Sequence, residues 1–205
     1  MQTGNTLYLD PKNNREYYSE SDGNFMPFEQ SLKAHTVLQR VAWMRSWVHE
    51  LGSESHIDIG CKDGYTCLTL QAEGIDCVGI DPSSDSIEQA RLKAQQARLD
   101  VTYLEGFGED IPEGIFADTL SIMEVIEHVV DPRRLLERAT KCAMYVLITT
   151  PDANGRHGMI DAERNPEHVR LYTKEELEKL CEEFGEVKEC TIIDDQICII
   201  FKTKK

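Results

Sequence analysis

Apolar positions along the chain follow two spacings, and their alternation predicts the order of helices and strands. Between residues 29 and 51 apolar side chains recur every three or four positions, which predicts one amphipathic helix that ends at Gly52. Beyond it, short runs rich in β-branched residues predict strands, and longer segments with the helical spacing separate them. The strands are expected at 55–60, 76–80, 101–104, 116–123 and 144–149.

The helices between these strands carry recognisable starts. One helix is expected from 64 to 73, and the next begins with Ser83 or Ser84 as its N-cap. The last helix is expected to begin at Thr173, because Glu176 lies three residues further on and completes a capping box.

A hairpin is expected at 187–193 and 196–203, with Asp194 and Asp195 in its turn. Parallel strands need crossover connections, so the alternation of strands and helices before it predicts an α/β domain. The expected sheet has seven strands, is mostly parallel with one antiparallel edge strand, and carries helices on both faces.

Composition places the chain among ordinary globular domains. Its 205 residues, 40% of them hydrophobic, fit one α/β domain with a normal core. No apolar run approaches twenty residues and the first residues lack an apolar segment, so we expect neither a membrane span nor a signal peptide. Seven cysteines without a C-x-x-C pair predict buried free thiols in the reducing cytoplasm. A net charge of −15 makes nucleic acid an unlikely partner, because phosphates would be repelled.

The segment His56–Gly64, reading HIDIGCKDG, predicts a ligand-binding turn after the first strand. Gly60 and Gly64 lack a Cβ, so the backbone N–H groups between them are open to a ligand. Asp81 ends the next strand, at the offset of a carboxylate that accepts from both ribose hydroxyls. Asp58 would repel a pyrophosphate but suits the ammonium of an amino acid, which favours S-adenosylmethionine over a dinucleotide.

These residues resemble motif I of the class I S-adenosylmethionine-dependent methyltransferases, (D/E)-x-G-x-G-x-G, with Lys62 in place of the middle glycine. The resemblance implies a Rossmann-like fold with a C-terminal antiparallel hairpin for the domain at 29–205. Residues 1–28 are polar without a clear periodicity, so we expect there either an N-terminal extension that folds over the site as a lid or a disordered tail. The resemblance also implies a set of cofactor contacts: Asp58, Gly60, Cys61, Gly64, Asp81, Pro82, Phe107, Gly108, Glu109 and Met123.

The segment Met123–Pro132, reading MEVIEHVVDP, follows the fourth strand, where α/β sheets place their ligands. It resembles the E-V-x-E-H segment of ubiquinone-biosynthesis O-methyltransferases and of related small-molecule and glycan methyltransferases. It also resembles small-RNA 2′-O-methyltransferases, in which two glutamates and two histidines bind a divalent metal. The resemblance implies catalytic roles for Glu124, His128 and His168, and a metal set of Glu124, Glu127, His128 and His168 for Mg²⁺, Mn²⁺ or Fe²⁺.

Three functions fit this sequence. The first is S-adenosylmethionine-dependent O-methylation of a small molecule or sugar, in which His128 or His168 is the general base if no metal is bound. The second is a metal-dependent RNA 2′-O-methyltransferase, which the acidic charge opposes. The third is a non-catalytic S-adenosylmethionine-binding protein, to which Lys62 points.

Two further alternatives concern single residues. Glu127 and His128 can instead brace the fourth strand against the substrate loop without binding a metal. His35, His49 and His56 are expected to be ordinary surface or helix-face histidines.

Overall fold

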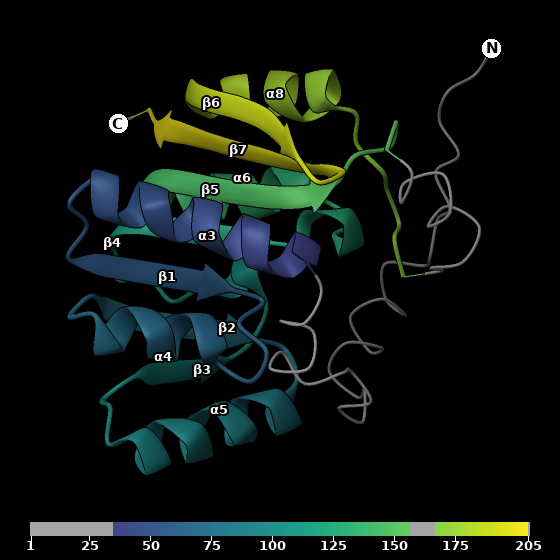
Figure 1. Ribbon diagram of the computed structural model, residues 1–205. Coiled ribbons are helices and arrows are strands. Elements are labelled where there is room, and N and C mark those ends of the chain that lie inside the picture. Colours follow the sequence, from purple (N-terminus) through teal and green to yellow (C-terminus); the bar gives the residue numbers. More distant parts are fainter. Residues whose placement is uncertain (1–34, 156–166, 205) are drawn as a thin grey trace.

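The computed structural model describes residues 35–155 and 167–204 (Figure 1). The expected extension or lid at 1–28 lies outside these residues. The strands are β1 (Ser55–Ile59), β2 (Asp76–Asp81), β3 (Thr102–Glu105), β4 (Ala117–Met123), β5 (Ala143–Pro151), β6 (Gly185–Ile193) and β7 (Gln196–Thr203). The helices are α3 (His35–Glu50), α4 (Tyr65–Ala72), α5 (Ser84–Ala97), α6 (Pro132–Cys142) and α8 (Lys174–Glu182), with short 3₁₀ turns η1 (Gly108–Asp110) and η2 (Ile126–His128).

The seven strands form one sheet in the order β3-β2-β1-β4-β5-β7-β6. Strands β1 to β5 are parallel, and β7 pairs antiparallel with both β5 and β6. The α/β sheet with a C-terminal antiparallel hairpin is therefore confirmed. The expected antiparallel edge strand is wrong in one respect: the antiparallel strand β7 lies inside the sheet, and β6 forms the edge.

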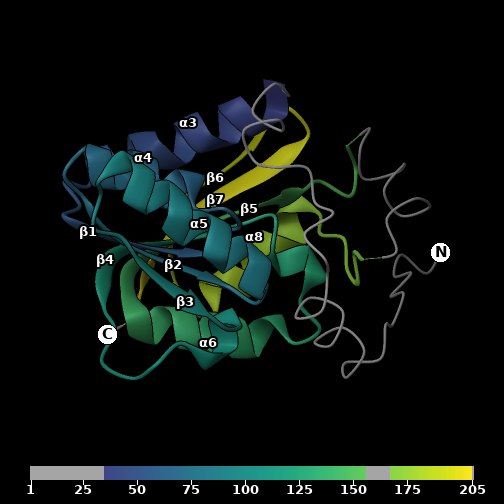
Figure 2. The same cartoon turned by 90° about the horizontal axis from the view of Figure 1, so that it is seen from below.

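Helices cover both faces of the sheet, as Figure 2 shows for α3 and α4 on one side and α6 on the other. Buried side chains of α3, α4 and α5 share one core with Cys77, Leu147 and Ile200 of the sheet. Side chains of α6 and α8 share the opposite core with other residues of the same strands, such as Ile80, Val146 and Ile199. The period of two along each strand thus divides the apolar residues between two cores.

Helices α5 and α8 begin at the capping residues expected from the sequence. The Ser83 hydroxyl accepts from the backbone N–H of Ser86 at 3.3 Å, and Thr173 with Glu176 forms the complete capping box. Capping fixes where the polypeptide leaves the end of β2 and enters α5, which is one of the positions that frame the site.

Two expectations about side-chain environment have different outcomes. All seven cysteines are free thiols, and all but the half-buried Cys190 are buried. The interpretation of His56 as a surface or helix-face histidine is wrong: it is 1% exposed, because it lies on β1 between two hydroxyl side chains of β4. Over residues 35–155 and 167–204, no helix combines the length and apolar character needed to cross a bilayer.

Candidate active site

A cavity of about 520 Å³ opens where the parallel strands end. The chain reverses its direction of winding at β1, since β2 and β3 lie on one side of it and β4 and β5 on the other. Such a switch point is where open α/β sheets bind their ligands. Seven of the ten predicted cofactor contacts line this cavity: Gly60, Asp81, Pro82, Phe107, Gly108, Glu109 and Met123. All four predicted catalytic or metal residues line it too: Glu124, Glu127, His128 and His168.

The glycine turn is anchored to the neighbouring strand. The backbone N–H groups of Gly60 and Cys61 donate to the carbonyl of Ile80 at 2.8 and 3.1 Å. Gly60 has a φ of 75°, and a Cβ there would overlap the Val125 side chain. Only glycine therefore fits this position without displacing its neighbour.

Lys62, at the position of the middle motif glycine, adopts the left-handed backbone conformation that favours glycine. Its φ is 47°, and its backbone N–H donates to Oδ2 of Asp81 at 2.9 Å. Ser83 N–H donates to Oδ1 of the same carboxylate at 2.9 Å. These two donors aim Asp81 at the glycine turn, and each oxygen retains acceptor capacity for a ribose hydroxyl. Burial raises the pKa of Asp81, while the two N–H donors oppose that rise.

A smaller cavity of about 100 Å³ adjoins the first and shares Gly60, Lys62, Met123 and Glu124 with it. Asp58 and Cys61 line this smaller space. Asp58 is buried and accepts from the Ser121 hydroxyl at 2.6 Å, and burial raises the pKa of Asp58 to about 7.

The remaining predicted cofactor contact, Gly64, lines neither cavity. It precedes α4 with a φ of 79°, and a Cβ there would overlap the ring and hydroxyl of Tyr103. The Tyr103 hydroxyl donates to the Gly64 carbonyl at 3.1 Å. The structure thus gives Gly64 a packing role beneath β3.

Arg40 belongs to the smaller cavity and was missed by the sequence argument. Its Nη1 lies 3.4 Å from Oε2 of Glu124, and its side chain is only 16% exposed. The sequence offered no signal for it, because Arg40 lies on a helix whose spacing indicated packing alone. The smaller cavity is therefore lined by both the Arg40 guanidinium of α3 and the Asp58 carboxyl of β1. These two groups suit the carboxylate and the ammonium of an amino acid.

Glu124 links four parts of the fold. It has a φ of 55°, and its backbone N–H donates to the Thr149 carbonyl at 2.9 Å. Its carboxylate accepts from the Thr149 hydroxyl at 3.2 Å and, with the Gln196 amide turned to donate, from that nitrogen at 2.7 Å. Burial and the neighbouring Glu127 raise the pKa of Glu124 to about 7, which Arg40 opposes.

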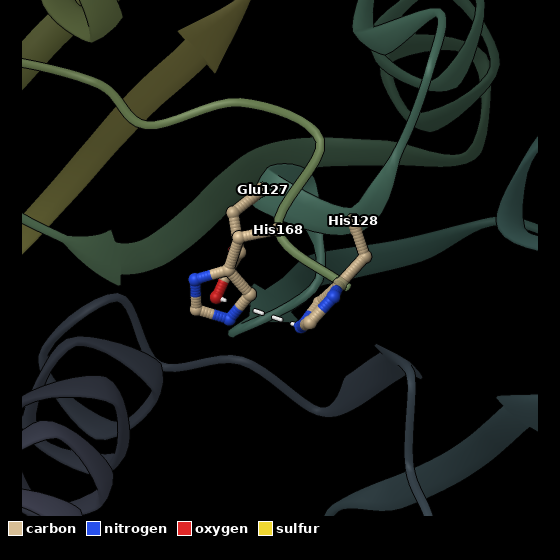
Figure 3. A group of neighbouring side chains, drawn as sticks. All are labelled: Glu127, His128 and His168. Carbon is tan, nitrogen blue, oxygen red and sulfur yellow. Dashed lines mark ion pairs between the residues drawn. The ribbon is translucent and has the colours of Figure 1, made fainter. Parts of the chain in front are cut away.

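Glu127, His128 and His168 form a cluster in which one ligand atom of each lies within 4.8 Å of the others (Figure 3). The imidazole rings of His128 and His168 meet edge to face, with centroids 4.6 Å apart. Glu127 is fully buried and accepts from the Thr150 hydroxyl at 3.0 Å. Glu124, the fourth predicted metal ligand, lies outside this cluster.

Two hydrogen bonds bring His168 to the other two residues. The backbone N–H of Arg170 donates to the Glu127 carbonyl at 3.2 Å. His128 Nδ1 lies 3.1 Å from the Glu167 carbonyl, which can only accept, so Nδ1 carries the proton and Nε2 the lone pair. Burial lowers the pKa of His128, so the neutral ring is favoured.

Comparison with known proteins agrees with this arrangement. A family model described as a methyltransferase domain matches residues 34–187. The ubiquinone biosynthesis O-methyltransferase of Bradyrhizobium diazoefficiens is 38% identical over 88 residues, which cover 43% of this chain and 35% of the relative. The enzyme of the same name from Pectobacterium atrosepticum is 26% identical over 127 residues, 59% of this chain and 52% of the relative. The chain thus spans about a third to a half of the length of the curated relatives it matches.

Among solved structures, magnesium protoporphyrin IX methyltransferase from Synechocystis PCC 6803 with bound S-adenosylmethionine superposes with a TM-score of 0.71 over 100% of both chains. At 14% identity this likeness concerns the fold alone. The family model matches three quarters of the chain, which is enough to assign the family. The chain belongs to the methyltransferase domain family and has the fold of the S-adenosylmethionine-dependent methyltransferases.

Proposed function

We propose that this chain transfers the methyl group of S-adenosylmethionine to a hydroxyl oxygen of a small molecule or sugar. One observation carries the proposal: His128 lines the larger cavity with Nδ1 3.1 Å from the Glu167 carbonyl and Nε2 3.9 Å from Oε1 of Glu127, so in the neutral ring Nε2 is the nitrogen that can accept a proton. A neutral imidazole held in one tautomer is a suitable base for a hydroxyl proton.

Each part of the cofactor has a matching part of the two cavities. Asp81 is placed to accept from the ribose hydroxyls, and Phe107 with the backbone of Gly108 and Glu109 borders the space for adenine. Arg40 and Asp58 suit the carboxylate and ammonium of the methionine end. The methyl group then lies toward the larger cavity, on the side of Glu124 and His128.

The reaction is an in-line displacement that needs alignment and the removal of one proton. The acceptor oxygen attacks the methyl carbon as the carbon–sulfur bond breaks, which leaves a neutral thioether, S-adenosylhomocysteine. His128 Nε2 takes the hydroxyl proton and later gives it to solvent. Most of the rate enhancement in such a step comes from holding the two reactants in line.

A divalent metal is compatible with the same cluster. Two imidazoles and a carboxylate suit Mn²⁺ or Fe²⁺ better than Mg²⁺, which prefers oxygen. Glu127, His128 and His168 would hold the ion, and Glu124 would stay with Arg40 and Thr149. A bound ion would lower the pKa of the acceptor hydroxyl.

The acceptor class is inferred from the cavity walls and from the relatives. Beyond the cofactor residues the larger cavity is lined by four apolar side chains and three charged ones, which favours an acceptor with both apolar and polar surface. They are Val125, Val129, Val130, Leu135, Asp131, Arg134 and Glu167. The curated relatives carry the name ubiquinone biosynthesis O-methyltransferase. A net charge of −15 opposes an RNA acceptor, and the free thiols support a cytoplasmic protein.

Calorimetry followed by a transfer assay tests the proposal. The protein should bind S-adenosylhomocysteine, and radiolabelled S-adenosylmethionine should methylate a member of a panel of phenols, catechols and sugars. Absence of cofactor binding would refute the proposal, and binding without transfer to any acceptor would favour the non-catalytic alternative.

Chelation separates the metal-free and metal-dependent reactions. Activity that persists after treatment with a chelator is expected for His128 acting alone. Loss of activity that Mn²⁺ or Fe²⁺ restores, together with labelling of RNA 3′ ends, would favour the RNA 2′-O-methyltransferase instead.

A further inference from the structure

Four buried polar side chains form a compact group inside the sheet, beneath the cofactor site. Strands β1 and β4 are neighbours, with His56 in register with Thr119 and Asp58 in register with Ser121. Residues two apart on a strand face the same side, so the four side chains share one face. All four are at most 3% exposed. Polar groups in such a position require hydrogen-bond partners within the protein.

The four side chains are joined in a continuous line. Thr119 Oγ1 lies 2.9 Å from Nδ1 of His56, and Nε2 of His56 lies 2.9 Å from Oγ of Ser121. Ser121 Oγ lies 2.6 Å from Oδ1 of Asp58, at the end that lines the smaller cavity. At the other end Thr119 Oγ1 lies 3.3 Å from the carbonyl of Ser55.

Each of the three inner groups can donate one hydrogen bond and accept another. Burial lowers the pKa of His56 to about 3, so the ring is neutral and has one N–H and one lone pair. When Asp58 is ionised, the donors point toward it: Thr119 to His56, His56 Nε2–H to Ser121, and Ser121 to Asp58. When Asp58 carries a proton, every bond reverses and Thr119 donates to the Ser55 carbonyl.

We propose that Thr119, His56 and Ser121 form a relay that reverses its direction when Asp58 loses its proton, so that binding of the cationic cofactor releases a proton to solvent and changes the tautomer of His56. His56 is thus a positioning residue, which acts on the cofactor through Ser121 and Asp58. The inference rests on the cofactor site proposed above. The proton of Asp58 passes to Ser121, that of Ser121 to Nε2 of His56 and that of Nδ1 to Thr119. Thr119 then releases its own proton to solvent past Ser55, which is half-buried.

The surroundings of Asp58 favour a proton in the absence of the cofactor. Burial raises the pKa of Asp58 to about 7, the negative charge of Asp81 adds to the rise, and the Ser121 and Thr66 hydroxyls oppose it. Titratable or charged groups face Asp58 from every neighbouring element: Cys61 and Lys62 in the glycine turn, Cys67 on α4, Tyr103 on β3, Asp81 on β2, Glu124 after β4 and Arg40 on α3. An ammonium and a sulfonium next to Asp58 would favour its ionised form.

A purely structural role for the four residues predicts a different behaviour. Hydrogen bonds that only join β1 to β4 would keep one direction whether the cofactor is bound or not. The tautomer of His56 and the number of protons released on binding therefore separate the two roles.

Nitrogen-15 NMR of the protein labelled at its histidines reads the tautomer directly. At about pH 6, below the pKa of Asp58, the free protein should show His56 with its proton on Nδ1. Saturation with S-adenosylmethionine should move the proton to Nε2. His56→Gln identifies the signal among the six histidines. The same His56 tautomer in both states would overturn the proposal.

Calorimetry in two buffers of different ionisation enthalpy counts the protons. Wild-type protein should release a proton on binding at about pH 6, and its affinity should rise as the pH is raised through about 7. Ser121→Ala removes a donor to the ionised Asp58 carboxylate, so the affinity at about pH 6.5 should fall roughly tenfold. The pH range over which the affinity rises should shift to higher pH.

Two further variants distinguish the relay from the general effect of losing a buried hydroxyl. Thr119→Val breaks the far end of the relay and should lower the affinity less than Ser121→Ala. Thr203→Val removes another buried hydroxyl, which donates to the carbonyls of Ala143 and Met144, and should leave proton release unchanged. If wild-type protein binds no cofactor, the proposed function fails and the relay with it. If it binds with no proton release, only the relay fails.

Discussion

The backbone N–H of Lys62 donates to the Asp81 carboxylate at 2.9 Å, so the residue that replaces a motif glycine also positions the acid expected at the ribose. The contact needs only the left-handed backbone at Lys62, and no particular side chain. The departure from the glycine motif is therefore accommodated by backbone strain.

Lys62→Gly should relieve that strain. A left-handed residue with a Cβ is disfavoured by about 1 kcal/mol, so the substitution should raise the free energy of unfolding by up to that amount and leave cofactor affinity within about twofold. Urea unfolding and calorimetry measure the two effects. Arg98→Gly is the matched control, since Arg98 has a φ of 58° at the end of α5. A large loss of affinity in Lys62→Gly would instead give the lysine side chain a role in binding.

Asp81→Ala should weaken cofactor binding strongly. The substitution removes the acceptor of two backbone N–H groups and the partner of the ribose hydroxyls. Charged hydrogen bonds contribute about 2 kcal/mol each, so affinity for S-adenosylhomocysteine should fall at least thirtyfold, by roughly that energy. Asp100→Ala, at an exposed position between α5 and β3, should bind normally. Equal affinities for the two variants would contradict the assignment of Asp81.

Asp58→Asn should flatten the pH dependence of stability of the cofactor-free protein. The pKa of Asp58 is raised from 3.8 to about 7 by folding, so its stabilising contribution is complete below pH 3.8 and is lost as the pH rises to about 7. Within that window the wild type should lose about 1.4 kcal/mol of unfolding free energy per pH unit from this group. Urea titrations at several pH values measure the difference between the two proteins. Asp76→Asn, at the exposed start of β2, should keep the wild-type slope.

His128→Gln should slow methyl transfer and leave cofactor binding intact. Loss of a general base lowers kcat by about 10²- to 10⁴-fold. Affinity for S-adenosylhomocysteine should stay within about twofold, because the proposed cofactor contacts do not include His128. His49→Gln replaces an exposed histidine paired with Glu73 and should show wild-type kinetics. Unchanged kcat in His128→Gln would assign the base elsewhere, with His168 next to be tested.

The sequence predicted the fold well because its signals were local. Hydrophobic spacing located the strands, and side-chain caps such as Ser83 and Thr173 located helix starts. The place of β7 was harder, since the order of strands within a sheet depends on pairing between distant segments.

The same contrast between local signals and long-range packing applies to the candidate site. Gly60 and Asp81 were predicted because turns and strand ends have recognisable spacing. Arg40 was missed, because the contact between α3 and Glu124 is made only by packing. His56 was misplaced, since a histidine reads as polar in sequence, whereas partners at Thr119 and Ser121 become visible only with the register of β1 against β4.

The inner position of β7 has a consequence for how this molecule assembles. Among the described strands β6 has only β7 as a neighbour, so β6 is held in the sheet only through the strand that follows it in the chain. Gln196, the amide partner of Glu124, begins β7. The pairing of β7 with β5 thus also completes the surroundings of Glu124, and a chain in which β7 has not paired with β5 has neither a complete sheet nor a complete pocket.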